Sequence, residues 1–193
     1  EVTGSLDIYD KVTLEMWIKP DSWEEDVPAW IGDWYFQLCT SSKAGIAVQQ
    51  YIDGDCDDLW KQGKWNYLVA AWNHSTDSRS VWINGQPVST TRAGASLTDR
   101  GVIIGALDTS GSDGFDGKIS EMRLWNKILS DDEVEEYWET SPDTTADGLV
   151  AEWEFYDGSG TTIGDITGNG YTGTINGAEW SEACAHGDVD GDG

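Results

Sequence analysis

The sequence predicts an all-β protein of the sandwich or barrel type. Short runs of alternating apolar and polar residues recur along the chain, and turn-forming residues separate them about every 8 to 12 residues. The stretch WINGQP contains an Asn-Gly pair, Asn84 and Gly85, which is the strongest short-range signal for a β-hairpin because both positions need a positive φ. One segment, near residues 130–139, has helical periodicity instead.

The expected strands follow one another along the chain. The first, VTLEMWIKP, alternates and so has two faces, one with Val12, Leu14, Met16 and Ile18 and the other with Thr13, Glu15, Trp17 and Lys19. Further strands are expected in WYFQLC, GIAVQQY, WNYLVAAW, RSVWI, QPVST, GVIIGA, GKISEMRLW and LVAEWEF. Tryptophans within these strands are expected in the core: Trp17, Trp72, Trp82, Trp125 and Trp153. The glycine-rich segment after residue 155 holds few large apolar residues, so we expect it to add a pair of strands to the sheets.

The helix is predicted in LSDDEVEEYWET. Ser130 is expected as its N-cap and Glu133 as the partner in a capping box. Acidic residues follow the cap, where the helix dipole favours negative charge. Val134, Tyr137 and Trp138 fall at i, i+3 and i+4, so one face of the helix can pack on the sandwich.

The chain is strongly acidic. It has 193 residues, of which 11 are basic and 36 acidic, giving a net charge of −25. Such a field repels nucleic acids and anionic membrane surfaces and attracts cations. No apolar stretch is long enough for a membrane span, and no signal peptide is evident. The three cysteines, Cys39, Cys56 and Cys184, allow one disulfide in three possible pairings.

Four stretches of the sequence resemble segments of one protein family, and they occur in the same order as in that family. The stretches are VTLEMWIKPDSW, KWNYLVAAWNHSTDSRSVWINGQPV, GFDGKISEMRLWNKILSDDEV and GLVAEWEFYDGSGTTIGDITGNGYTGTINGAEW. They resemble the laminin-G-like branch of the concanavalin A-like lectin/glucanase superfamily. The resemblance implies a two-sheet antiparallel jelly-roll sandwich over residues 1–183, with one concave sheet and ligand loops at one rim. Residues 184–193 would form an acidic tail that resembles the start of a dockerin-like calcium loop.

Two positions depart from the family pattern. The short strand that usually opens the family, before the region matching SLDIYD, is nearly absent, which would leave an unpaired sheet edge. Ser120 stands in GKIS where members often have an aspartate, which removes a possible calcium ligand from that position.

The sequence favours a protein without catalytic activity. Glycoside hydrolases on this fold use paired carboxylates on one strand, and no such array is found. Glu152 and Glu154 share a strand face, but we interpret this face as solvated. The two histidines, His74 and His186, lie in polar loops and form no nucleophilic arrangement with a serine or cysteine.

An aromatic segment between residues 23 and 60 is the predicted ligand surface. Sugars bind to aromatic faces surrounded by polar groups, and this segment mixes tryptophans and tyrosines with aspartates. The candidates are Trp30, Trp34 and Trp60. The alternative is that these tryptophans belong to the core.

Three acidic segments are candidate Ca²⁺ sites. In the final GDVDGDG, Asp188, Asp190 and Asp192 have the spacing of the first half of a calcium loop, and a glycine follows at the turn. DITGNG offers Asp165 and Asn169, and DGDCDD offers Asp53, Asp55 and Asp57. In NHS, Asn73 is an N-glycosylation acceptor in an expected hairpin loop.

These observations predict a secreted, calcium-binding jelly-roll module that binds a glycan or an extracellular protein at the cell surface. The alternative is a structural subunit of an extracellular filament or surface layer, in which copies associate through calcium and added strands. A glycoside hydrolase is the third interpretation.

Overall fold

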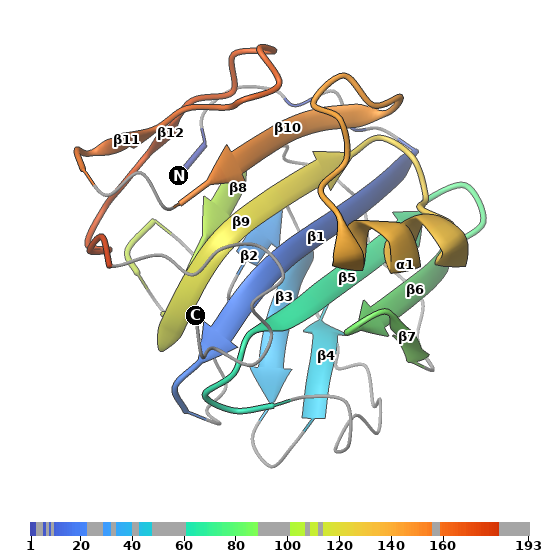
Figure 1. The fold of residues 1–193 in the computed structure, drawn as a ribbon, viewed down its shortest axis with the longest axis horizontal. Coiled ribbons are helices and arrows are strands. Elements are labelled where there is room, and N and C mark those ends of the chain that lie inside the picture. Colours follow the sequence, from blue (N-terminus) through green and yellow to red (C-terminus); the bar gives the residue numbers. More distant parts are fainter. Residues whose placement is uncertain are drawn as a thin grey trace.

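The computed structural model describes residues 1–2, 6, 8, 10–22, 29–31, 34–39, 43–47, 61–88, 101–106, 109–111, 114–155 and 159–181. Within them it is an antiparallel β-sandwich with one short helix, as the sequence predicts (Figure 1). The strands are β1 (Lys11–Pro20), β2 (Ala29–Ile31), β3 (Trp34–Cys39), β4 (Lys43–Ala47), β5 (Asn66–Asn73), β6 (Ser78–Ile83), β7 (Gln86–Val88), β8 (Val102–Ile104), β9 (Gly117–Trp125), β10 (Leu149–Glu154), β11 (Thr162–Ile163) and β12 (Gly173–Thr174).

The larger sheet has six strands in the order β10-β9-β1-β5-β6-β7. Its long central strand β1 pairs with β5 on one side and with β9 on the other. The predicted alternation of β1 is confirmed, because Val12, Leu14, Met16 and Ile18 are all buried in the core between the sheets. The opposite face of β1 is buried as well, since α1 (Asp131–Glu139) packs over it.

Helix α1 begins and packs as its sequence predicts. The Ser130 hydroxyl accepts a hydrogen bond from the Glu133 backbone N–H, and the Glu133 carboxylate accepts one from the Ser130 N–H at 2.9 Å. Val134 is fully buried, and the Tyr137 ring stacks on Trp125 with centroids 5.3 Å apart. The expected core tryptophans form parts of the two apolar clusters: Trp72 and Trp153 between the sheets, and Trp17, Trp82 and Trp125 beneath α1.

The hairpin between β6 and β7 has the predicted turn. Asn84 and Gly85 have φ values of 50° and 73°. Gly85 is also required by packing, because a Cβ at this position would lie 2.6 Å from the Trp138 ring of α1. The turn therefore forms part of the surface on which α1 packs.

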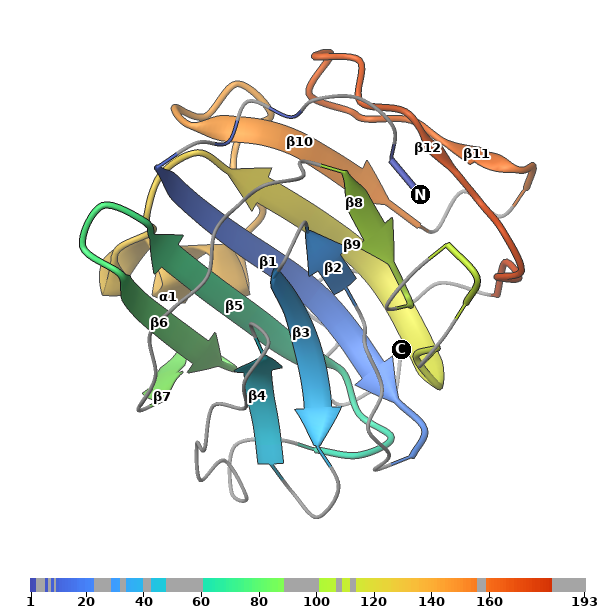
Figure 2. The same ribbon diagram turned by 180° about the vertical axis from the view of Figure 1, so that it is seen from behind.

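The second sheet has four strands in the order β4-β3-β2-β8. Figure 2 shows it on the side of the sandwich opposite α1. β4 begins two residues earlier than GIAVQQY predicts, and residues 48–51 lie outside the described part of the chain. The predicted strand pair in the glycine-rich segment is confirmed as β11 and β12.

The first residues of the chain cover part of the sheet edge that the sequence analysis expected to be open. Val2 forms antiparallel bridges with Val102 of β8 and with Gly173 of β12, so it lies between these two strands. The Val2 N–H donates to the Val102 carbonyl, and the Thr174 N–H donates to the Glu1 carbonyl, both at 2.8 Å. One residue thus joins the four-stranded sheet to the β11–β12 pair.

Candidate functional site

The outer side of the four-stranded sheet is the candidate ligand surface. Among the described residues, α1 covers the outer side of the six-stranded sheet, and no helix covers that of the four-stranded sheet (Figures 1 and 2). The register aligns Trp30 of β2 with Tyr35 of β3 and with Ile103 of β8. The next row aligns Ile31 with Trp34 and with Val102, which is fully buried in the core.

The register puts the two predicted tryptophans in adjacent rows of the sheet. The side chains of Trp30 and Trp34 lie outside the described part of the structure, so their place in a ligand surface stays a prediction. Trp60 lies outside the described residues, so its position in the ligand surface stays a prediction.

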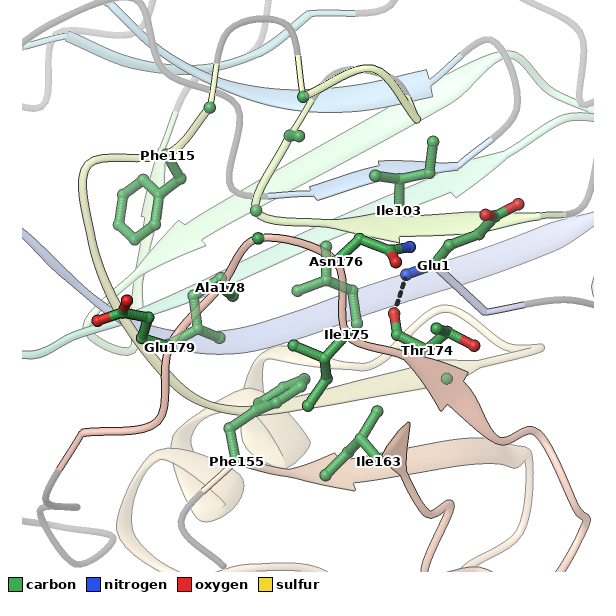
Figure 3. A pocket seen from close by; sticks show the side chains of 18 of the residues that line it. Glu1, Ile103, Phe115, Phe155, Ile163, Thr174, Ile175, Asn176, Ala178 and Glu179 are labelled. Carbon is green, nitrogen blue, oxygen red and sulfur yellow. Dashed lines mark hydrogen bonds between the residues drawn. The ribbon is translucent and has the colours of Figure 1, made fainter. Parts of the chain in front are cut away.

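A cavity of about 500 Å³ lies beside this sheet, between β8, β9 and the chain around β12 (Figure 3). We call it the β8–β12 cavity. Its walls are mainly apolar and include Ile104, Ile119, Phe155, Ile163 and Trp180. Several of these side chains also pack on the inter-sheet core, so the cavity is an opening into the sandwich.

The Asp165 loop is held by a dense set of hydrogen bonds. Asp165 Oδ1 accepts from the Glu152 N–H at 3.1 Å, from the Thr167 N–H at 3.0 Å and from the Thr167 hydroxyl at 2.7 Å. Its Oδ2 accepts from the Tyr171 N–H at 3.3 Å, and Asn169 Nδ2 donates to the Val150 carbonyl at 3.0 Å. These donors satisfy the hydrogen-bonding capacity of the Asp165 carboxylate, and the bonds with Glu152 and Val150 fix the loop to β10.

The other predicted metal ligands lie outside the described residues. They are Asp53, Asp55 and Asp57 in one segment and Asp188, Asp190 and Asp192 in the tail. Within the described part of the chain, no three His, Cys, Asp or Glu side chains gather as a metal site. The boundary expected at residues 183 and 184 also falls on residues outside this part.

Asn73 is the last residue of β5, at the start of the turn that leads to β6. Its side chain is half-buried, in contrast to the exposed residues that follow it in the turn. The N-glycosylation of Asn73 stays a prediction.

A buried ionic cluster overturns the interpretation of Glu152 as a solvated residue. The register aligns Glu15, Arg123 and Glu152 across β1, β9 and β10, on the face beneath α1. Arg123 pairs with Glu15 at 2.7 Å, with Glu121 at 2.9 Å and with Glu152 at 2.6 Å, and all four side chains are almost fully buried. Sequence reasoning missed this cluster, and the signal was an arginine among apolar residues in the second half of β9, two positions after Glu121.

The cluster shifts the pKa values of its members. Burial raises the pKa of the Glu15 carboxyl, although Arg123 acts in the opposite direction, and the same balance raises the pKa of Glu152. Burial alone would lower the pKa of Arg123, but the surrounding glutamates raise it above its ordinary value. Arg123 Nη2 also donates to the Ser141 hydroxyl at 2.9 Å, and Tyr67 donates to Glu15 at 2.9 Å. Each carboxylate of the cluster thus pairs with Arg123, while Oε2 of Glu152 is buried without a hydrogen-bond partner.

The fold and the open sheet define a lectin-like jelly-roll domain. The model of the family described as the concanavalin A-like lectin/glucanases superfamily, in its Laminin_G_3 branch, matches residues 3–135. This match covers more than half of the chain, and the chain therefore belongs to this superfamily.

Pentraxin-related protein PTX3 is similar in sequence. The mouse protein (Mus musculus) is 29% identical over 90 residues, which cover 40% of this chain and 24% of PTX3. The human protein (Homo sapiens) is 27% identical over 86 residues, which cover 38% of this chain and 23% of PTX3. The match spans about a quarter of the length of these curated relatives.

Solved structures share the fold at low sequence identity. A candidate carbohydrate-binding protein from Bacteroides ovatus has a TM-score of 0.72 and 18% identity over 91% of this chain and 57% of its own. The heptameric SAP-like pentraxin of Limulus polyphemus has a TM-score of 0.62 and 15% identity, covering 90% of this chain and 87% of its own. The CBM40 domain of the Ruminococcus gnavus IT-sialidase, bound to α2,3-sialyllactose, has a TM-score of 0.53 and 14% identity, covering 67% and 83%.

Proposed function

We propose that the protein is a non-catalytic, extracellular module that binds carbohydrate on the outer side of its four-stranded sheet. The observation that carries the proposal is the asymmetry of the sandwich. Helix α1 covers the six-stranded sheet, whereas the register of the other sheet aligns Trp30 with Tyr35 and Ile103, a row that we assign to its outer face as part of the proposal. Aromatic residues on an open sheet match the apolar faces of sugar rings.

Two of the similar folds support a glycan as the ligand. The B. ovatus protein is described as carbohydrate-binding, and the R. gnavus domain holds a sialylated oligosaccharide. Among the described residues no helix is long and apolar enough to cross a membrane. The net charge of −25 disfavours nucleic acid as a partner.

The buried cluster supports binding without hydrolysis. Glu152 is one of the two carboxylates that the sequence analysis weighed against a hydrolase, and its carboxylate is held by Arg123 beneath α1. A glycosidase needs its carboxyl pair in a cleft that the substrate can enter. Glu152 does not meet this condition.

Trp30→Ala provides the test. A panel of neutral and acidic oligosaccharides is titrated by calorimetry against the unmodified protein and the variant. For a sugar that binds, the loss of the Trp30 ring is expected to weaken binding by about 1 to 3 kcal/mol, or about 5-fold to 150-fold. Folding is expected to persist, since an outer-face residue is not part of the core.

Trp34→Ala is the matched control. Its row includes the buried Val102, so the loss of this tryptophan is expected to lower the melting temperature. Trp60→Ala is measured beside them as the third predicted ligand residue. Unchanged sugar affinity in both Trp30→Ala and Trp60→Ala would place the ligand surface elsewhere.

We further propose that the module binds Ca²⁺ through its tail. Asp188, Asp190 and Asp192 supply only half of a calcium loop, so water or other chain segments would complete the six to eight oxygen ligands. The Asp165 loop is a weaker candidate, because hydrogen-bond donors already surround its carboxylate. The assay is thermal unfolding with calcium and with chelator.

Self-association is a second candidate, and a similar fold favours it. The Limulus pentraxin is a heptamer. A structural subunit of an extracellular assembly that associates through calcium would show a molar mass above that of one chain by light scattering, measured first with calcium and then with chelator. A monomer under both conditions would exclude it.

A further inference from the structure

Strand β10 forms one edge of the six-stranded sheet, and a loop occupies the backbone groups that it directs outward (Figure 1). Among the described strands, β10 pairs with β9 alone. The Phe155 N–H donates to the Ser120 carbonyl of β9. Because successive residues of a strand direct their backbone groups to opposite sides, Trp153 also faces β9, whereas Glu152 faces the edge.

The loop first meets this edge as a strand would. Asp165 forms an antiparallel bridge with Trp153, and the Ile166 N–H donates to the Glu152 carbonyl at 2.9 Å. In a continuing antiparallel strand, Ile166 would lie opposite Glu152, and its carbonyl would accept from the Glu152 N–H.

Two side chains replace the backbone of such a strand. Asp165 Oδ1 accepts from the Glu152 N–H at 3.1 Å, in the role of a backbone carbonyl. Val150 lies where the register of β10 and β9 shifts, and its carbonyl accepts from Asn169 Nδ2 at 3.0 Å, in the role of a backbone N–H. The loop therefore satisfies the edge of β10 without offering a strand edge of its own.

The acceptor side chain is held in place from two directions. The Thr167 N–H and hydroxyl donate to Asp165 Oδ1 at 3.0 and 2.7 Å. At the far end of the loop, Trp153 Nε1 donates to the Tyr171 carbonyl at 2.6 Å, and the Trp153 side chain is fully buried between the sheets. The loop is thus anchored to the core as well as to the strand edge.

Glycines on both sides of Asn169 turn the chain away from β10. Gly168 and Gly170 have φ values of 83° and 88°, in the left-handed region that glycine adopts without steric cost. Only the Asn169 side chain has to reach back to the strand.

An edge strand without such a loop is a template for another chain, because its N–H and C=O groups are unpaired. A second copy of β10 fits this edge best. Two copies related by a two-fold axis pair antiparallel, and each residue then meets its own counterpart or a near neighbour, so the edge is self-complementary.

We propose that residues 165–171 cap the edge of β10 and prevent a second copy of this chain from pairing its own β10 there. Asp165 is the acceptor of the cap and Asn169 is its donor. This role requires no metal ion, and it directs any self-association of the protein to other surfaces.

Two isosteric variants separate a cap from a metal site. Asp165→Asn keeps an acceptor oxygen for the Glu152 N–H, whereas Asn169→Asp replaces the donor to the Val150 carbonyl with a charged acceptor. A cap therefore tolerates the first change better than the second. A Ca²⁺ site would show the opposite order, because additional carboxylate charge strengthens calcium binding.

Asp165→Ala removes the acceptor completely. The readouts are the exchange rate of the Glu152 amide proton, with the Trp153 amide as an internal control that faces β9, and the molar mass by light scattering at rising protein concentration. Asn169→Asp removes a single hydrogen bond, so it tests association even if Asp165→Ala does not fold.

In Asp165→Ala the Glu152 amide is expected to exchange at least about tenfold faster than in the unmodified protein, while the Trp153 amide changes less. Asp165→Ala and Asn169→Asp are expected to raise the molar mass relative to the unmodified protein as the concentration rises, and Asp165→Asn is not. Unchanged Glu152 exchange in Asp165→Ala would overturn the proposal. So would an unchanged molar mass in Asn169→Asp, or a larger effect of Asp165→Asn than of Asn169→Asp.

Discussion

Replacing Arg123 with methionine is expected to lower the free energy of unfolding by about 4 kcal/mol at pH 7. Arg123 is buried and holds Glu15, Glu121 and Glu152 through ion pairs of 2.7, 2.9 and 2.6 Å. Methionine fills a similar volume but leaves the carboxyls without a cation. Breaking a buried pair in this way costs about 3 to 5 kcal/mol, because the remaining charge stays desolvated.

Protonation of the carboxyls limits this cost and makes it depend on pH. A carboxyl with an ordinary pKa of 4.5 must take up a proton to stay neutral at pH 7. This uptake costs about 3.4 kcal/mol, at 1.36 kcal/mol for each pH unit. Near pH 4 the uptake is almost free, so we expect a loss of about 1 to 2 kcal/mol there, from the missing hydrogen bonds.

Proton linkage gives the direction in which the stability of the folded protein changes with pH. Glu15 and Glu152 have raised pKa values in the folded protein, so the folded state binds more protons than the unfolded state above about pH 4.5. Their contribution to stability is complete below the unfolded pKa and is lost as the pH rises through the folded pKa. Without Arg123 both folded pKa values rise further, and the decline with pH becomes steeper.

Urea unfolding followed by tryptophan fluorescence at pH 4 and pH 7 measures this effect. Lys127→Met is the control, because the Lys127–Glu133 pair has a length of 2.7 Å but is about one-third exposed. Its loss is expected to cost less than about 1 kcal/mol. A cost below 1 kcal/mol for Arg123→Met at pH 7, or equal costs at the two pH values, would refute the reasoning.

Three further results are expected. Ser130→Ala should lower the free energy of unfolding by about 1 kcal/mol in chemical denaturation, because the N-cap and its capping box with Glu133 are lost, and an unchanged midpoint would contradict this. Millimolar calcium should raise the melting temperature of chelated protein by roughly 5 to 10 °C if the site is saturated about 100-fold over its Kd, and Asp188→Asn combined with Asp190→Asn should remove the shift. Plant, algal and sialylated glycans should release no reducing ends, and hydrolysis that disappears in Glu152→Gln would show that the buried carboxylate reacts.

The features that the sequence predicted correctly depend on neighbouring residues. Ser130 and Glu133 are three positions apart, and Asn84 and Gly85 are adjacent, so their effects on the backbone can be inferred from local rules. The alternation in β1 predicted two faces in the same way. It did not show that both faces are buried, because α1 is contributed by a segment more than 100 residues away.

The features that were missed depend on distant pairs. Glu15 and Arg123 are 108 residues apart, and only the register of β1 and β9 brings them together. An isolated glutamate in a strand is usually solvated, which explains the error for Glu152. Likewise, nothing local to Val2 indicates that it will lie between β8 and β12. For the candidate site, the strand register gives the rows to which Trp30 and Trp34 belong, and their role in binding, like that of Trp60 and the acidic tail, stays a prediction.

The position of Val2 also has a consequence for how the chain folds. The hydrogen bonds between Glu1 and Thr174 join residues 173 positions apart. During synthesis the β11–β12 pair emerges after the other described strands, so Glu1 and Val2 cannot pair with it until the residues between them have been made. Contacts of such sequence separation are slow to form, and partly folded chains with unpaired strand edges are prone to aggregation. Joining of the β11–β12 pair to the four-stranded sheet is therefore expected to be a late step of folding, after β1, β5 and β9 have formed the central sheet.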